Sequence, residues 1–171
     1  SAVRRQRAEQ DLQAGQARLA MALEASTTGL WDLDLRTRRA YVSPTYFGML
    51  GYDGSGFDDT MESHFTALLH PDDRAATLAA IEQKMASEGE FVLEFRMRAH
   101  DGEYHWIVSH GRVVERDEAG RPLRAIGTHT DVSERKEMEL ELRTASEAQE
   151  AIFQAASVGI LLLRERVIMR C

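Results

Sequence analysis

Cysteine is almost missing from this chain: among 171 residues the only cysteine is Cys171, at the last position. A single thiol excludes an internal disulfide and a zinc site built from cysteines. Chains without disulfides are typical of reducing compartments. We therefore expect a cytoplasmic location.

Long apolar runs and an excess of basic charge are missing as well. The longest apolar run, residues 158–163, has the length of a strand, whereas a bilayer-spanning helix needs about 20 residues. Lys and Arg number 21 against 28 Asp and Glu, a formal net charge of −7. Nucleic-acid binding needs clustered basic residues. We expect no nucleic-acid partner and no membrane contact by this stretch of chain.

The composition that remains is that of a folded domain with additions at both ends. Hydrophobic residues make up 43% and charged residues 29% of the chain, which excludes intrinsic disorder. Residues 1–24 carry an apolar stripe with helical spacing, and so narrow a stripe needs a surface to pack on. We expect an amphipathic dimerisation helix here. Its apolar positions are Ala8, Leu12, Leu19, Ala22 and Leu23.

From Gly29 the apolar period changes to two, which is typical of a half-buried strand. A second short strand is expected over residues 40–43. Ser43 stands directly before Pro44, and this pair predicts the N-cap and first position of a short helix that Gly51 ends.

The next part of the chain predicts two helices and three strands. The helices are expected over residues 61–69 and 72–87, with His70 in the turn that caps the longer one. Between the first two strands, Asp101-Gly102 predicts a tight hairpin in which both central residues have positive φ. Pro122 opens the last strand, where a proline is tolerated.

A second helical period covers residues 134–150, with Met138, Leu142, Ala145 and Ile152 in heptad-like order. We expect a linker helix, with Asp131 as its cap. Residues 155–161 then resemble residues 25–31, which predicts that 151–171 begin a second, truncated domain. Two unrelated helix-to-strand turns are the alternative.

Several motifs in this order resemble the PAS family in the form that carries a C-terminal PAC segment. The resemblance covers residues 23–136, and its most specific part is the stretch 127–136. The motifs are Trp31-Asp32-Leu33-Asp34, Leu50-Gly51-Tyr52, His70-Pro71-Asp72-Asp73-Arg74, Asp101-Gly102-Glu103-Tyr104-His105-Trp106 and Gly127-Thr128-His129-Thr130-Asp131-Val132-Ser133-Glu134-Arg135-Lys136.

The resemblance implies an α+β fold: a five-stranded antiparallel sheet with short helices on one face, flanked by amphipathic signalling helices at both ends. It places the sensor domain at residues 25–133, the linker signalling helix at 134–150 and the start of a second PAS domain at 151–171. It also implies a small interior pocket, used for sensing in bacterial signalling proteins.

Nine apolar residues are candidates for the wall of that pocket. The alternative is that they only fill the core, as residues at strand spacing usually do. The candidates are Tyr46, Phe47, Leu50, Phe65, Leu69, Ile81, Phe91, Phe95 and Trp106.

No cofactor is predicted, although an unknown small ligand remains possible. Haem-binding relatives carry their ligating histidine on the long helix, and residues 72–87 contain none. Flavin-binding relatives need a reactive cysteine, and Cys171 stands at the chain end. His100, His105 and His110 are five residues apart, so neighbours in an extended strand point to opposite faces and no metal site is expected.

Signal transmission is assigned by the resemblance to Asp131, Glu134 and Arg135, where the last strand passes into the linker helix. An N-cap with an ordinary exposed ion pair is the alternative. The sequence contains no phosphate loop, nucleophile elbow or HExxH pair. We therefore expect no enzymatic activity from these residues themselves.

The sequence thus predicts a sensory and dimerisation PAS module of a multidomain bacterial signalling protein. Binding of a small ligand or a partner would be relayed through the exit helix to an effector in the same chain, with a diguanylate cyclase favoured. A histidine kinase effector, or a ligand-free dimerisation spacer, is the alternative. The expected partner is a second copy, bound through the flanking helices and the sheet face.

Overall fold

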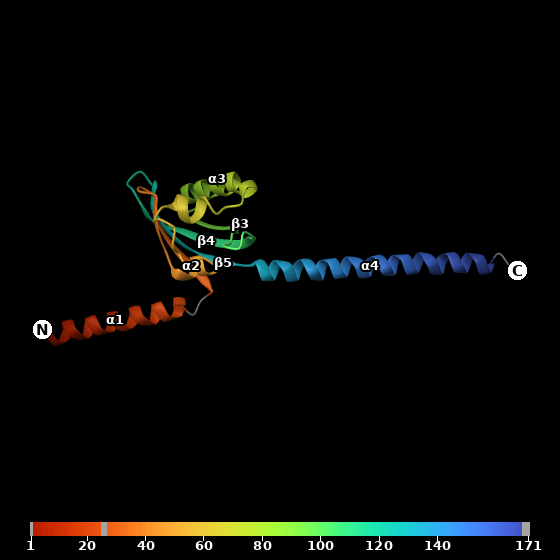
Figure 1. The fold of residues 1–171 in the computed structure, drawn as a ribbon, viewed down its shortest axis with the longest axis horizontal. Helices are drawn as coiled ribbons and strands as arrows, with labels where there is room; N and C mark the ends of the chain where they lie inside the picture. The colour runs from red at the N-terminus through yellow and green to blue at the C-terminus, as the bar shows by residue number, and fades with distance from the viewer. Residues whose placement is uncertain (1, 25–26, 169–171) are drawn as a thin grey trace. The chain divides into compact units, whose positions relative to one another are not determined.

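The computed structural model describes residues 2–24 and 27–168. The chain forms two compact units with their boundary between Val132 and Ser133, and each is described by itself. Figure 1 shows the elements. In chain order these are α1 (Ala2–Glu24), β1 (Thr28–Asp34), β2 (Arg39–Val42), α2 (Pro44–Gly48), the π-helical turn η1 (Glu62–Thr66), α3 (Pro71–Ser87), β3 (Glu90–Arg98), β4 (Tyr104–Arg116), β5 (Pro122–Asp131) and α4 (Ser133–Ile168).

The five strands form one sheet in the order β2-β1-β5-β4-β3, and every neighbouring pair is antiparallel. β5, the last strand, lies at the centre, between β1 and β4. This confirms the predicted fold class. Because side chains alternate along each strand, one face carries Leu33, Phe95, Ile107 and Ala125, all buried.

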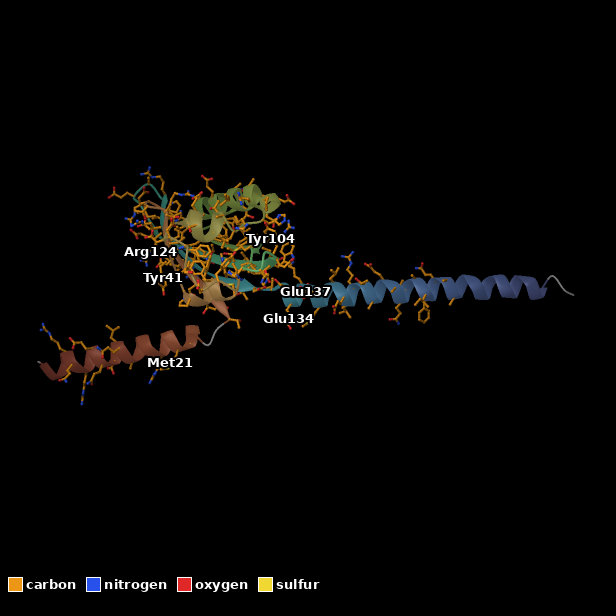
Figure 2. All side chains as sticks on the ribbon, viewed as in Figure 1. Met21, Tyr41, Tyr104, Arg124, Glu134 and Glu137 are labelled. Carbon is orange, nitrogen blue, oxygen red and sulfur yellow. The ribbon has the colours of Figure 1, made fainter. Side chains whose placement is uncertain are left out.

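Residues of α2, η1 and α3 pack against this inner face and close the core. The outer face carries side chains of the opposite parity, and Tyr41 on β2 is 67% exposed (Figure 2). Val92 and Ile126 are also exposed on this face. The sheet therefore has one covered face and one open face.

Helix α3 begins as the sequence predicts. The Asp72 backbone N–H donates to Nδ1 of His70 at 3.2 Å, and Pro71 opens the helix. Asp72 and Asp73 lie in the first turn, where the helix dipole favours negative charge. His70 is confirmed as the capping residue.

Two local predictions need correction. Ser43 occupies the N-cap position of α2 but makes no capping hydrogen bond, because its Oγ accepts the Leu30 backbone N–H at 2.9 Å instead. Between β3 and β4, Gly102 has φ 94° but Asp101 does not have positive φ. The loop spans five residues, 99–103, so a longer turn with one left-handed residue replaces the tight two-residue one.

The flanking helices also differ in part from expectation. Helix α1 forms where it is predicted, although the side chains of Ala8, Leu19 and Leu23 lie outside the described part of the chain. Helix α4 continues to Ile168, so its predicted end near residue 150 is wrong. A strand after residue 155 would need a partner strand for its hydrogen bonds, whereas a helix satisfies them internally. The start of a second PAS domain at 151–171 stays a prediction, and residues 169–171 lie outside those described.

Candidate functional site: an interior cavity

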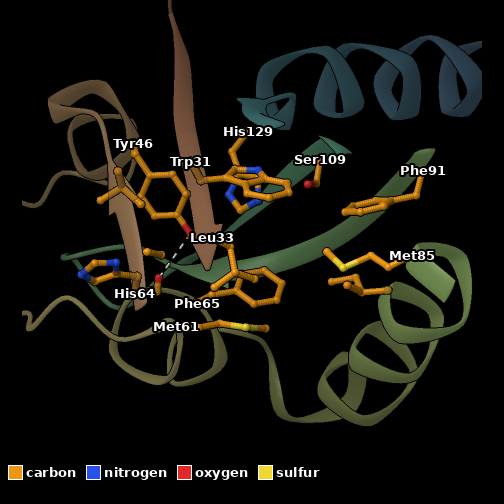
Figure 3. A pocket seen from close by; sticks show the side chains of 13 residues that line it. Trp31, Leu33, Tyr46, Met61, His64, Phe65, Met85, Phe91, Ser109 and His129 are labelled. Carbon is orange, nitrogen blue, oxygen red and sulfur yellow. Dashed lines mark hydrogen bonds between the residues drawn. The ribbon is translucent and has the colours of Figure 1, made fainter. Parts of the chain in front are cut away.

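A cavity of about 50 Å³ lies between the inner face of the sheet and the helices that cover it (Figure 3). Most of its walls are apolar. The lining residues are Trp31, Leu33, Ala40, Val42, Tyr46, Met61, His64, Phe65, Ile81, Met85, Phe91, Ser109 and His129.

The volume limits what the cavity holds. A water molecule needs about 10–15 Å³ by the same kind of measure, so about 50 Å³ admits a ligand of only a few non-hydrogen atoms. Binding sites for drug-sized ligands and cofactors usually measure about 300–1,000 Å³. A haem or flavin does not fit these walls as they stand.

His129, on the central strand β5, has aromatic neighbours on several sides. Its ring stacks on Tyr46 with centroids 4.8 Å apart, and Trp31 lies edge-on at 6.2 Å. Phe65 and Phe95 follow at 5.8 and 5.4 Å. Burial in these surroundings lowers the pKa of His129 from 6.5 to about 3. The imidazole is therefore neutral at pH 7.

Two other residues of the cavity wall, Tyr46 and His64, carry polar groups. The Tyr46 hydroxyl donates to the His64 carbonyl at 3.4 Å, and burial raises the pKa of this tyrosine. His64 is itself only 6% exposed, and its Nδ1 has no hydrogen-bond partner. An unpartnered buried nitrogen of this kind is uncommon in folded proteins.

Glycines make room for the large rings of the wall. A Cβ on Gly127 would overlap the indole of Trp31 and the His110 carbonyl, and one on Gly111 would overlap the ring of Phe91. Both glycines lie on the inner face, opposite each other on β5 and β4. The aromatic wall therefore depends on two positions without a side chain.

The strand that carries His129 ends two residues later, at Asp131. Asp131 Oδ2 lies 2.6 Å from Nδ1 of His105 on β4. Helix α4 begins at Ser133, and Arg135 Nη1 donates to Glu139 Oε1 at 2.9 Å within that helix. His129 of the cavity wall and the predicted relay residue Asp131 thus lie on the same strand, β5, and on the same face of it.

Comparison with known proteins decides the family. The family model described as the PAS fold matches residues 39–129. The chain belongs to the PAS family. It is a PAS sensory module of signal-transduction proteins, a kind of domain that is typically non-catalytic.

Relatives of this PAS domain occur in sensor proteins. The chain is 33% identical to sensor protein FixL of Bradyrhizobium diazoefficiens over 124 residues, which cover 71% of this chain and 24% of FixL. It is 34% identical to hybrid signal transduction histidine kinase A of Dictyostelium discoideum over 90 residues, which cover 49% of this chain and 4% of the kinase. The chain therefore spans a quarter or less of these relatives.

Solved structures agree with this fold. A sensory box histidine kinase/response regulator from Burkholderia thailandensis matches with a TM-score of 0.65 and 33% identity, covering 78% of this chain and 98% of that one. The N-terminal domain of a diguanylate cyclase with PAS/PAC sensor from Marinobacter aquaeolei matches with a TM-score of 0.56 and 24% identity, covering 64% and 98%. Histidine kinases and a diguanylate cyclase thus both appear among the neighbours of this PAS domain.

The structure separates the nine candidate pocket residues into three groups. Four line the cavity: Tyr46, Phe65, Ile81 and Phe91. Another four are buried in the core without lining it: Phe47, Leu50, Leu69 and Phe95. Trp106 lies on the outer face instead, with the Arg96 guanidinium 5.5 Å from its ring centre. Its neighbour Ile107 points inward, and adjacent residues on a strand point to opposite faces.

Several lining residues were absent from the sequence prediction, above all His129, His64 and Ser109. A signal for His129 did exist, because Ala125, Gly127 and His129 alternate on β5 and share its inner face. The pattern alone does not place the ring inside, because histidine is less often fully buried than apolar residues are. His64 had no comparable signal, because a short π-helical turn has no recognisable period.

Among the described residues, no three His, Cys, Asp or Glu side chains come together as metal ligands. No helix within 2–24 or 27–168 combines the length and apolar character needed to cross a membrane.

Proposed function

We propose that this PAS domain is the sensory and dimerisation module of a multidomain bacterial signalling protein. Occupation of the interior cavity by a small molecule shifts β5, and β5 transmits the shift to the exit helix α4. One observation carries this proposal: His129 in the cavity wall and Asp131 at the strand end are two residues apart on the same face of β5.

Asp131 is the first relay residue in this proposal. Its contact with His105 joins the ends of β5 and β4 across 2.6 Å, so a shift of either strand changes the environment of the carboxylate. Glu134 and Arg135 stand in the first turn of α4, directly after it in the chain. The ligand must bind the two arrangements of β5 with different affinity, since otherwise it shifts no equilibrium.

Replacing Asp131 tests the relay in the full-length protein. We expect Asp131→Ala to leave the resting output and abolish most of the response to the native stimulus. Asp32→Ala is the matched control, because Asp32 forms a similar cross-strand ion pair, with Arg124 Nε of β5 at 2.9 Å, far from the exit. A normal response in Asp131→Ala, or an equal loss in both variants, contradicts the relay.

The effector that we favour is a diguanylate cyclase located later in the same chain, and a histidine kinase is the alternative. The matched part of this chain corresponds to 24% of FixL and 4% of the Dictyostelium kinase, so the effector of the full-length protein is part of the proposal. The decisive assay supplies the full-length protein with GTP and, separately, with labelled ATP. Formation of cyclic di-GMP supports the cyclase, and autophosphorylation without it contradicts that choice.

A ligand-free spacer is the competing function for the domain itself. It would use the same fold to hold two copies together, with an interior that never exchanges its contents. Native mass spectrometry of the purified chain reports the oligomer mass and any retained small molecule together. A dimer with a retained molecule supports the sensor, whereas a dimer that never takes up any molecule offered to it supports the spacer.

A further inference from the structure

Polar side chains contribute to the cavity wall, but none of their polar atoms faces the cavity. The surface that the described lining residues present to this space is entirely apolar. The lining residues that carry nitrogen or oxygen in their side chains are Trp31, Tyr46, His64, Ser109 and His129.

His64 is turned away from the cavity. Its ring lies edge-on to Phe47, with centroids 5.3 Å apart, and to Phe57 at 6.4 Å. Neither phenylalanine lines the cavity. Figure 3 shows the His64 ring pointing away from Phe65. The backbone carbonyl of His64 accepts the hydrogen bond of the Tyr46 hydroxyl, so this hydroxyl is also engaged outside the cavity surface.

The other polar groups of the wall are withdrawn in the same way. The ring of His129 is neutral at pH 7 and lies among aromatic rings. Ser109 is only 2% exposed. Trp31 Nε1 is buried and has no hydrogen-bond partner among the described residues, yet it adds nothing to the cavity surface. A molecule inside the cavity therefore meets no hydrogen-bond donor and no acceptor.

This surface keeps water out of the cavity. By size, about 50 Å³ would hold a few water molecules, but a buried water needs about two to four polar partners. Cavities lined by apolar side chains stay dry and take up apolar molecules. A polar ligand would give up its hydrogen bonds to water without replacement. The chemistry of the wall thus selects against both water and polar ligands.

The open volume depends on small and adaptable side chains. Ala40 and Ser109 are the smallest residues of the wall, so a larger side chain at either position is expected to fill part of the cavity. Met61, directly before η1, and Met85 on α3 also line it. Methionine is flexible and polarisable, and it adapts to irregular packing. Such side chains close around a small apolar molecule without needing a fixed hydrogen-bond geometry.

We propose that the ligand of this cavity is a small apolar molecule without hydrogen-bonding groups, such as a short hydrocarbon or a halogenated hydrocarbon. It lies among the rings of Trp31, Phe65 and Phe91 and the side chains of Met61 and Met85. Because the cavity is dry, the ligand displaces no water when it enters. This ligand class rests on the sensory function proposed above, because it concerns the same cavity.

The size of the cavity also sets the affinity. An engineered cavity of about 150 Å³ accepts benzene or xenon, so one of about 50 Å³ accepts only a few non-hydrogen atoms. Even the best ligands of about three non-hydrogen atoms bind with a Kd of about 1 mM. A useful probe is therefore one that dissolves well into the millimolar range, as dichloromethane does.

Dichloromethane and ethanol are matched probes, because they have the same number of non-hydrogen atoms and differ in the hydroxyl group. The side-chain methyl resonances of Met61, Ile81 and Met85 report binding by NMR. We expect saturable shifts with dichloromethane at a Kd in the millimolar range, and we expect ethanol to bind at least about tenfold more weakly. Dichloromethane shifts that never saturate, or ethanol binding as tight as that of dichloromethane, overturn the proposal.

Ile81→Ala tests whether the bound molecule lies in this cavity. Ile81 lines the cavity from α3, so its truncation enlarges the space, and we expect the variant to bind benzene, which the unchanged protein excludes. Leu78→Ala is the matched control: it removes the same number of carbon atoms from the same helix, and Leu78 packs against the core without lining the cavity. Equal behaviour of the two variants towards benzene places the bound molecule elsewhere and overturns the proposal.

Ser109→Val provides the same test in the opposite direction, also if Ile81→Ala does not fold. The larger side chain fills part of the cavity from β4, so we expect dichloromethane binding to weaken at least about tenfold. Val92→Leu, on the open face of the sheet, adds bulk outside the cavity and should leave the Kd unchanged. An unchanged Kd in Ser109→Val contradicts binding in this cavity.

The ligand class and the relay fail in distinguishable ways. Dichloromethane binding is measured on this chain alone, whereas the relay is measured as output of the full-length protein. Saturable binding together with a normal response in Asp131→Ala rejects the relay and keeps the ligand class. Absence of saturable binding together with a lost response keeps the relay and rejects this ligand class.

Discussion

The imidazole of His129 stacks on the ring of Tyr46, with centroids 4.8 Å apart and planes inclined by 28°. The first residue comes from the central strand and the second from α2, so this contact joins the sheet to a covering helix. Burial lowers the pKa of His129 to about 3, so the imidazole in this contact is neutral near pH 7. Acidification is therefore expected to destabilise the fold through a histidine at the centre of the core.

The first prediction concerns stability against pH. An unfolded chain protonates this histidine near pH 6.5, whereas the folded chain does so only near pH 3. Protons thus bind preferentially to the unfolded state between these values, and stability falls as the pH drops. From pH 7 to 5 we expect His129 to account for a loss of roughly 2 kcal/mol. Urea denaturation at both pH values measures it.

His129→Phe is the informative variant for this prediction, since a phenyl ring keeps an aromatic side chain at this position. Its loss of stability from pH 7 to 5 should be smaller than that of the unchanged protein. The exposed His110→Gln serves as the control and should behave as the unchanged protein does. If His129→Phe shows the same pH dependence as the unchanged protein, His129 is not the group responsible.

The second prediction concerns Gly127, which lies beneath the indole of Trp31. An added methyl group would overlap both that ring and the His110 carbonyl, and the backbone of a central strand cannot yield easily. We expect Gly127→Ala to destabilise the domain by about 1–3 kcal/mol. Gly48→Ala is the control, because a Cβ there meets no atom within 4 Å. Equal unfolding midpoints in urea for the two variants would refute the packing argument.

The third prediction concerns the ion pair that fixes the start of α3 to the edge strand β3. Asp73 accepts the Arg96 backbone N–H at 3.1 Å and its side-chain Nε and Nη2 at 2.9 and 2.7 Å. Asp73 is 20% exposed and Arg96 29%. Asp73→Ala removes all three bonds and leaves a half-buried guanidinium, so we expect a loss of about 1–3 kcal/mol.

Glu147→Ala is the matched control for Asp73→Ala. Arg143 Nε contacts Glu147 at 2.8 Å, but both side chains are more than 60% exposed. Such exposed ion pairs on a helix contribute less than about 0.5 kcal/mol to the free energy of unfolding. The measurement is the free energy of unfolding in urea. A loss for Asp73→Ala no larger than that for Glu147→Ala would mean that burial adds nothing to the Asp73–Arg96 pair.

The fourth prediction concerns dimerisation through α4. Met138, Leu142 and Ile152 follow the heptad-like order along this helix, and their exposed fractions are 57, 74 and 69%. Exposed apolar residues at this spacing are typical of a helix that pairs with another helix. We expect Leu142→Glu to weaken the dimer at least tenfold in sedimentation velocity experiments. Leu140→Glu, off this stripe, should leave it intact, and equal effects of both changes would exclude this stripe as the interface.

The spacing of apolar residues within each segment decides how much of the fold the sequence predicts. The alternation in β1 and β3 predicted which side chains face the core, because neighbouring residues on a strand must point to opposite faces. The same rule could have separated Trp106 from Ile107, and it could have placed His129 inside. Trp106 was predicted to line the pocket instead, and His129 was not among the predicted lining residues.

Local sequence thus determined the PAS fold, the position of each strand and the cap of α3 at His70, because these depend on period and short-range hydrogen bonds. Tertiary structure alone decided that Ser43 bonds to β1, that Gly127 and Gly111 accommodate the rings of Trp31 and Phe91, and that His129 stacks on Tyr46. These relationships join residues far apart in the chain. Their partners are fixed only when the sheet and the helices have closed around them.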